Sequence, residues 1–225
     1  TVRRGRSSMS YIVDCLVFVA YAFRDVAATI VTMFAPIGFL PYKDVSGKLV
    51  LITGGAGALG TQLAARFAKR GARIAIWDID ETGLQKTAAI CEAHGAKVVR
   101  WWSVDMRSRE SIANAAASLR KELGDVDVLV NNAGIGFGGK LLEQKDENIV
   151  QCIDVNFVAH FWMAKEFLPA MVLADAGHMV SIASLGGQVV SAQDMIPYCA
   201  SKFGAIAVQE GLENELTCMG ATGVR

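Results

Sequence analysis

Along most of the chain, apolar runs alternate with segments that carry apolar residues at helical spacing. From Lys48, "KLVLIT" is a continuous apolar run, which is typical of a parallel strand buried on both faces. In the helix expected from Thr61, Leu63 and Phe67 lie four positions apart on one face, and Gly71 stands where a helix commonly ends. The alternation continues through expected strands at 72–78, 96–105, 126–134 and 178–184 and expected helices at 81–94, 108–124, 146–171 and 197–218. This alternation predicts an α/β fold built on a doubly wound parallel sheet.

The first forty residues have a different pattern. Two apolar runs, Cys15–Phe23 and Val26–Leu40, are separated by a charged Arg-Asp pair. Neither run reaches the roughly 18–20 uninterrupted apolar residues of a simple spanning helix, and the charged pair is costly in lipid away from an interface. The apolar character runs all round the helix, which disfavours packing on a soluble domain. We expect 1–40 to be a hydrophobic membrane-anchor segment, as a helix or a hairpin. A packed helix and a secretory signal with Arg3–Arg6 as its basic region are the alternatives.

Composition narrows the class of protein. Of the 225 residues, 52% are hydrophobic and the formal net charge is +0, which argues against a disordered tail protein and against a nucleic-acid binder. Widely spaced cysteines without a C-x-x-C pair favour a reducing compartment over a disulfide framework. The three histidines are isolated, so we expect no metal site. The cysteines are Cys15, Cys91, Cys152, Cys199 and Cys218.

A glycine-rich turn, "TGGAGALG" (53–60), joins the first expected strand to its helix. Such a turn can bring backbone N–H groups and a helix N-terminus against a pyrophosphate, and Gly55, Gly57 and Gly60 meet the fingerprint G-x-G-x-x-G. Asp78 ends the second expected strand, where a carboxylate can bind ribose hydroxyls and would repel a 2′-phosphate. No Arg or Lys lies in the turn or directly after Asp78, so NAD is favoured over NADP. A solvated strand-end acid is the alternative.

A tyrosine and a lysine share one face of the last expected helix. "YCASK" places Tyr198 and Lys202 four positions apart. A free tyrosine keeps its proton up to pH about 10, and a nearby ammonium favours the phenolate form. Ser184, at the end of the preceding strand, could hydrogen-bond a substrate oxygen. The spacing Y-x-x-x-K alone is common by chance, so the pair gains meaning only from its context.

That context is an ordered set of motifs on one βα frame. "TGGAGALG", "WDI", "VD" (104–105), "NNAG" (131–134), "DVN" (154–156), Ser184 and "YCASK" follow one another along the chain. This order resembles the short-chain dehydrogenase/reductase family over residues 47–225 and implies its Rossmann-type fold. Segments such as "KDVSGKLVLITGG" and "IPYCASKFGA" look most like its membrane-associated retinol dehydrogenase and 17-beta-hydroxysteroid dehydrogenase group.

The resemblance implies a role for each catalytic position. Tyr198 would be the general acid/base that exchanges a proton with the substrate oxygen. Lys202 would hold the nicotinamide ribose and favour the Tyr198 phenolate. Ser184 would orient the carbonyl, and Asn156 would support a proton relay through water to Lys202. The domain, 41–225, would then be an NAD-dependent alcohol dehydrogenase or ketone reductase.

The resemblance also implies the residues that bind the cofactor. Asp105 would contact adenine, and Asn132 would lie beside the cofactor and brace the central strand. The full implied set is Gly54, Gly57, Ala58, Leu59, Gly60, Asp78, Asp105, Asn132, Tyr198 and Lys202.

Members of that group carry an N-terminal hydrophobic anchor at the endoplasmic reticulum or on lipid droplets. We therefore expect a membrane or lipid-droplet surface as one partner, with the catalytic domain facing the cytosol. The substrate would be a small hydrophobic alcohol or ketone, such as a retinoid, a steroid or another lipid, and a homodimer is left open. Two other functions stay open: a non-catalytic lipid-surface protein that keeps the fold, and a cytosolic NADP reductase with a packed N-terminus.

Two features depart from the family pattern. The single-domain branch has the spacing T-G-x-x-x-G-x-G, whose middle glycine is Ala58 here, whereas Gly54, Gly57 and Gly60 meet the T-G-x-x-G-x-x-G spacing of the extended branch. In addition, "GATGVR" ends the chain where the family would begin its sixth strand. On this interpretation the sheet is incomplete at its C-terminal side, and the 225 residues alone would be poorly active.

Overall fold

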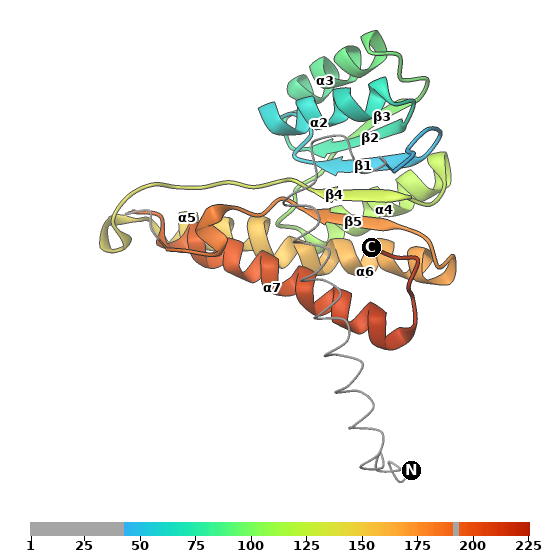
Figure 1. The fold of residues 1–225 in the computed structure, drawn as a ribbon. Coiled ribbons are helices and arrows are strands. Elements are labelled where there is room, and N and C mark those ends of the chain that lie inside the picture. The colour runs from blue at the N-terminus through green and yellow to red at the C-terminus, as the bar shows by residue number, and fades with distance from the viewer. Residues whose placement is uncertain (1–42, 191–193) are drawn as a thin grey trace, which may run out of the picture. The chain divides into compact units, whose positions relative to one another are not determined.

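In the computed structural model, which describes residues 43–190 and 194–225, five parallel strands form one sheet (Figure 1). The strands are β1 (Leu49–Thr53), β2 (Arg73–Asp78), β3 (Val99–Ser103), β4 (Val128–Asn131) and β5 (His178–Ser181). Their order is β3-β2-β1-β4-β5, and all neighbouring strands are parallel. The order changes direction between β1 and β4, which opens a crevice at the carboxyl ends of these strands. The expected Rossmann-like parallel sheet is confirmed.

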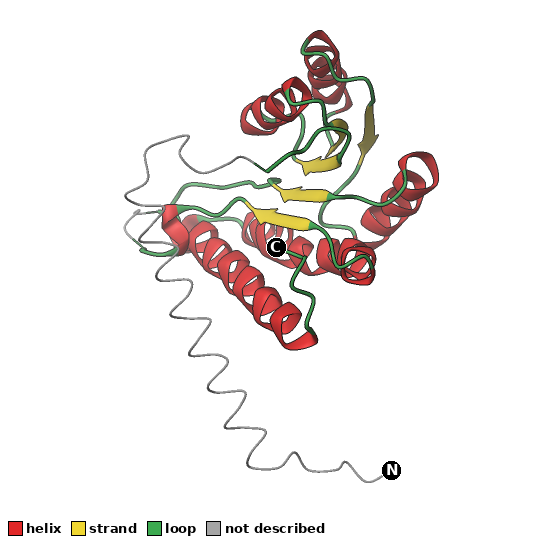
Figure 2. Cartoon of the chain, turned by 45° about the vertical axis from the view of Figure 1, so that its right-hand side comes forward, coloured by secondary structure: helices red, strands yellow, loops and turns green. Residues whose placement is uncertain are grey.

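Helices cover both faces of the sheet, as Figures 1 and 2 show. On one face lie α2 (Ala58–Lys69) and α3 (Glu81–Ala93), and on the other lie α4 (Arg109–Leu123), α6 (Ala159–Leu173) and α7 (Ile196–Met219). The short helices are α5 (Asp146–Ile153), η1 (Leu141–Glu143), η2 (Asp154–Val158) and η3 (Leu185–Gly187). This is the two-faced arrangement that the sequence predicts for a doubly wound sheet.

The apolar run of β1 supplies both cores. Leu49 and Leu51 pack with α4 and α6, whereas Val50 and Ile52 pack with α2 and α3. All five β1 residues are buried, since successive side chains point to opposite faces and both faces are covered. This explains why the strand is a continuous apolar run and not an alternating one.

Several boundaries differ from the sequence-based expectation. Helix α2 begins at Ala58 and not at Thr61, because Gly57 has the extended backbone of an N-cap and lets the helix start directly after it. β5 ends at Ser181, because its neighbour β4 ends at the paired residue Asn131 and offers no strand beyond it. Ser184 therefore follows the strand by three residues.

The long helix expected over 146–171 is also interrupted. Between α5 and α6, η2 is a π-helical turn, in which the N–H of Ala159 donates to the carbonyl of Asp154. A π-turn inserts one extra residue and often marks a functional site. Here it contains Asn156, whose side chain is fully buried.

The two ends of the chain differ in what the structure describes. The expected anchor, 1–40, lies outside the described residues, and no described helix combines the length and apolarity needed to cross a membrane. At the other end Val224 forms a parallel bridge with Gly177, and the N–H of Met179 donates to the carbonyl of Arg225 at 2.7 Å. The last residues thus run beside β5, where a sixth strand is expected.

Candidate active site

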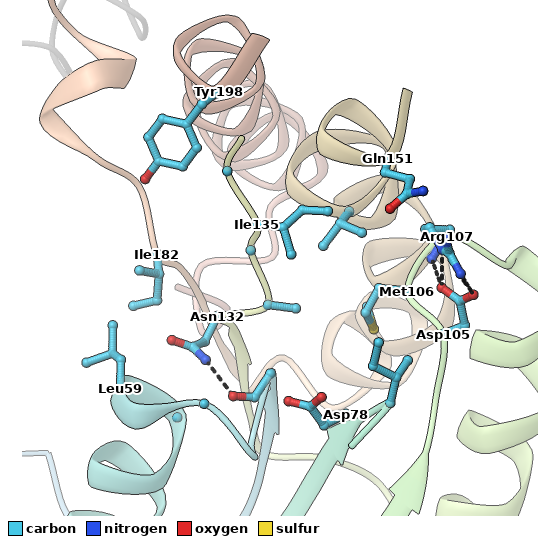
Figure 3. Close-up of a pocket in the computed structure, with 18 of the residues that line it drawn as sticks. Leu59, Asp78, Asp105, Met106, Arg107, Asn132, Ile135, Gln151, Ile182 and Tyr198 are labelled. Atoms are coloured by element: carbon cyan, nitrogen blue, oxygen red, sulfur yellow. Dashed lines mark hydrogen bonds and ion pairs between the residues drawn. The ribbon is translucent and has the colours of Figure 1, made fainter. Parts of the chain in front are cut away.

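A cavity of about 590 Å³ opens at the carboxyl edge of the sheet. The glycine turn, the ends of β2, β3 and β4, and the first turns of α7 line it (Figure 3). We call the region of Asp78, Asp105 and Arg107 the carboxylate end, and the region of Asn156, Ser184, Tyr198 and Lys202 the tyrosine end. Figure 3 shows Tyr198 and Asp78 on opposite sides of the cavity. The predicted residues that line it are Gly54, Gly57, Ala58, Leu59, Gly60, Asp78, Asp105, Asn132, Tyr198 and Lys202.

Close backbone packing explains two of the loop glycines. Gly54 has φ +66°, and a Cβ there would lie 2.8 Å from the Cα of Ala133. A Cβ on Gly60 would overlap the carbonyl oxygen of Gly54. At Gly57 a Cβ would meet only that same oxygen, at an ordinary 3.4 Å. The packing therefore requires Gly54 and Gly60, which are common to both registers, and leaves Ala58 in a regular position as the first residue of α2.

Asn132 joins the glycine turn to β4. Its Nδ2 donates to the carbonyls of Thr53 at 2.8 Å and Gly54 at 3.1 Å. The buried Thr53 hydroxyl accepts in turn from the N–H groups of Asn132 and Ala133, both at 3.0 Å. The expectation that Asn132 braces the central strand agrees with these bonds. Sequence reasoning missed Thr53, although a polar residue directly before the glycines was a usable signal.

Asp78 and Asp105 bring two carboxylates to the carboxylate end. Asp78 Oδ2 accepts from the N–H of Ala56 in the glycine turn at 3.0 Å. Asp105 is bonded by Arg107, whose NH2 donates to Oδ2 at 2.7 Å and whose Nε donates to Oδ1 at 2.9 Å. The hydrogen bond from Arg107 holds the pKa of the Asp105 carboxyl below its usual range. Arg107 also lines the cavity and was not singled out from the sequence.

At the tyrosine end, α7 presents Tyr198 and Lys202 one turn apart. The Lys202 ammonium lies 5.9 Å from the centroid of the Tyr198 ring and donates to the carbonyl of Ile182 at 2.7 Å. Burial lowers the pKa of Lys202. The Ser184 hydroxyl and the Tyr198 ring lie 3.5 Å and 3.7 Å from the point where a Cβ on Gly186 would stand. The structure thus brings Ser184, Tyr198 and Lys202 together, with Ser184 just outside the cavity lining.

Asn156 is fully buried and bonds to Ser201 of α7. Its Oδ1 accepts from the N–H of Ile135 at 2.8 Å, and its Nδ2 donates to the carbonyl of Ile135 at 2.7 Å and to Ser201 Oγ at 3.0 Å. Ser201 Oγ donates to the carbonyl of Tyr198 at 2.7 Å. Asn156 therefore ties the loop after β4 to the backbone of α7 through Ser201. Sequence reasoning missed Ser201, the one serine inside "YCASK".

A buried histidine lies close to Lys202. Burial, and then the positive charge of Lys202, lower the pKa of His160 to about 4, so the imidazole is neutral near pH 7. Its Nδ1 lies 3.4 Å from Ser181 Oγ. Over 43–190 and 194–225, no group of three or more His, Cys, Asp or Glu side chains is placed to hold a metal ion.

The cavity suits a dinucleotide. At Gly54 and Gly60 the turn cannot carry a side chain, so bare backbone lies beside the N-terminus of α2, where phosphates bind favourably. Asp78 places a hydrogen-bond acceptor at the carboxylate end of the cavity, and Lys202 places a cation at the tyrosine end. The carboxylate and the cation suit ribose hydroxyls, and the bare glycine turn suits the pyrophosphate of a dinucleotide.

Comparison with known proteins gives the family. Residues 48–225 match the profile described as "short chain dehydrogenase". Estradiol 17-beta-dehydrogenase 11 of Pongo abelii is 39% identical over 217 residues, which are 96% of this chain and 71% of that protein. The solved structure of a metagenomic short-chain oxidoreductase in complex with NADP has a TM-score of 0.75 and 31% identity, and the match covers 81% of this chain and 81% of that chain. The structure of a short-chain dehydrogenase/reductase from Burkholderia phymatum in complex with NAD has a TM-score of 0.76 and 29% identity, and the match covers 81% of this chain and 64% of that chain. The chain belongs to the short-chain dehydrogenase family.

Proposed function

We propose that this protein is an NAD-dependent alcohol dehydrogenase or ketone reductase that acts on a small hydrophobic substrate, with Tyr198 as general acid/base. The observation that carries the proposal is the placement of Tyr198 and Lys202 at one side of a cavity whose other side holds Asp78. This places proton-transfer groups opposite a ribose-binding carboxylate.

Each residue of the tyrosine end has a chemical task. The Tyr198 hydroxyl gives a proton to the substrate oxygen during reduction and takes it back during oxidation. The Lys202 ammonium binds ribose hydroxyls, and the Ser184 hydroxyl donates to the developing oxyanion. Asn156 ties the loop after β4 to α7, the helix that carries Tyr198 and Lys202, and supports the proton relay to Lys202. The nicotinamide ring, when bound, supplies the hydride chemistry.

Asp78 supports NAD over NADP. Its carboxylate faces the cavity and carries no ion pair in the described part of the chain, so a 2′-phosphate would meet an uncompensated negative charge. The solved relatives include both an NAD and an NADP enzyme, so the preference rests on this chain's own residues.

A hydrophobic substrate is supported by the segment between Ser184 and Tyr198. Leu185, Val189 and Ile196 are exposed there, next to the proton-transfer groups. The relative estradiol 17-beta-dehydrogenase 11 is named for a steroid, and retinoids and other lipids are hydrophobic in the same way. With an anchor at 1–40, the enzyme would work at the endoplasmic reticulum membrane or on lipid droplets and face the cytosol.

The test is turnover by the full-length protein expressed in membranes. NADH formation is followed against a panel of retinol, steroid and fatty alcohols, with Tyr198→Phe as the matched control that keeps the ring and loses the hydroxyl. We expect activity with at least one substrate class and a loss of roughly 10²–10⁴-fold in the variant. NAD binding without turnover of any substrate would favour a non-catalytic lipid-surface protein. A protein that still sediments with membranes after deletion of 1–40 would contradict the anchor.

A further inference from the structure

We propose that Arg107 is a positioning residue for the cofactor's base: its guanidinium holds the Asp105 carboxylate in the orientation in which it accepts from the amino group of adenine. The inference rests on the proposed use of NAD. It adds a specificity role for a residue that neither the motifs nor the family resemblance indicate.

The contacts between the two side chains fix the carboxylate plane. Arg107 uses both Nε and NH2, with distances of 2.7–3.1 Å to the two oxygens, and its own backbone N–H donates to Oδ1 at 2.9 Å. A guanidinium is a rigid planar fork, so two parallel bonds set the orientation of a carboxylate as well as its charge. An ionised carboxylate offers about four acceptor sites. Among the described residues, 43–190 and 194–225, Oδ2 accepts only from the guanidinium, so it keeps capacity for a further donor.

Hydrogen bonds from other residues fix the backbone of Asp105. Arg107 therefore determines the orientation of the Asp105 side chain. The N–H of Asp105 donates to Ser111 Oγ at 3.1 Å, and its carbonyl accepts from the N–H of Ser108 at 3.0 Å. Both Asp105 and Arg107 line the cavity, next to Met106 and on the same side as Asp78 (Figure 3). The fork therefore acts directly at the carboxylate end.

The surroundings argue against a phosphate-binding role for Arg107. On its other side it lines a second hollow together with Asp146, Glu147 and Asp154. The charge of Asp154 adds to that of Asp105 in raising the pKa of Arg107. A guanidinium that is already paired and surrounded by carboxylates is a poor site for a dianionic 2′-phosphate.

The experiment measures dinucleotide affinity by calorimetry on the full chain. The two probes are NAD and nicotinamide hypoxanthine dinucleotide, in which a carbonyl acceptor replaces the amino donor of adenine. We expect the wild type to prefer NAD, and we expect Arg107→Ala to weaken NAD binding roughly tenfold with little change for the analogue. Arg107→Lys, which keeps the charge without the fork, should recover only part of the preference. In an Asp105→Asn background, Arg107→Ala should produce no further change.

The control is Arg100→Ala, which removes a comparable exposed arginine–carboxylate pair, with Glu122, away from the cavity. It should leave the affinities for both dinucleotides unchanged. An equal loss for NAD and the analogue in Arg107→Ala would mean a purely structural brace and overturn the proposal. Tighter NAD binding in Arg107→Ala would mean that Arg107 competes with adenine, and this result would also overturn the proposal. A wild type that binds no dinucleotide would instead remove the proposed function itself.

Discussion

At the tyrosine end of the cavity, Asn156 and Lys202 are buried and bond to segments far away in the sequence, whereas at the carboxylate end Asp105 and Arg107 are half exposed and bond to each other. Polar groups that are buried cost free energy when a partner is removed, while exposed ion pairs contribute little. The difference implies two kinds of substitution. Changes at the tyrosine end should cost folding stability as well as activity, and changes at the carboxylate end should alter ligand selectivity with little effect on the fold.

The largest effect is expected at Asn156. Asn156→Ala removes the acceptor of the Ile135 N–H, one of two donors to the Ile135 carbonyl, and the amide donor to Ser201, all from a fully buried position. We expect a loss of about 4 kcal/mol in the free energy of unfolding, measured by urea denaturation. Asn114→Ala, an exposed position in α4, is the matched control and should change stability by less than about 0.5 kcal/mol. Equal, small effects of both variants would remove the contrast between the two ends.

The buried His160 should make the tyrosine end sensitive to acid. Its pKa is lowered from 6.5 to about 4, so the unfolded chain binds the proton more readily than the folded one. The stabilisation is therefore present above pH 6.5 and is lost as the pH falls from 6.5 through 4, by about 3 kcal/mol in total. His160→Gln should flatten this part of the dependence of unfolding free energy on pH. Parallel wild-type and variant curves between pH 7 and 4 would contradict the expectation.

Part of the site could be predicted from the sequence, and the rest depends on contacts that only the fold creates. Asp78, the glycine turn and the Tyr198–Lys202 pair are readable because strand ends, glycine spacing and i, i+4 positions are local patterns. The π-turn was missed because "DVN" fits a continuous helix, and only the bonds from Asn156 to Ile135 explain the extra residue. Ser201 matters because folding brings Asn156 to it, whereas Arg107 bonds to Asp105 two positions away and gains its importance from its place in the cavity lining. Ser184 was placed on a strand whose length is set by its neighbour β4.

The glycine turn, which belongs to neither end, allows a separate test, because two of its glycines should behave differently. Gly60→Ala forces the turn to move, since the new Cβ would overlap the carbonyl of Gly54, and we expect a loss of about 2 kcal/mol together with loss of NAD binding. At Gly57 the φ of −71° suits alanine, and a Cβ would meet the Gly54 carbonyl oxygen at an ordinary 3.4 Å, so Gly57→Ala should cost at most about 1 kcal/mol as an N-cap change. Thermal unfolding and calorimetry with NAD measure both. If Gly57→Ala folds normally and still loses NAD, the ligand itself requires the Gly57 register.

The smallest effect is expected at Asp78, where charge alone can be removed. In Asp78→Asn the amide oxygen still accepts from the N–H of Ala56, and only the exposed N–H of Asp80 loses its acceptor, so the glycine turn and the fold should change little. The repulsion of a 2′-phosphate disappears, and the ratio of NAD to NADP affinity should fall roughly tenfold, which is about 1.4 kcal/mol. Calorimetry with both dinucleotides measures the ratio, and Asp80→Asn, at the N-cap of α3 and outside the cavity lining, is the control. If Asp78→Asn weakens both dinucleotides equally, Asp78 acts as a brace for the turn, and selectivity at this end must come from other groups.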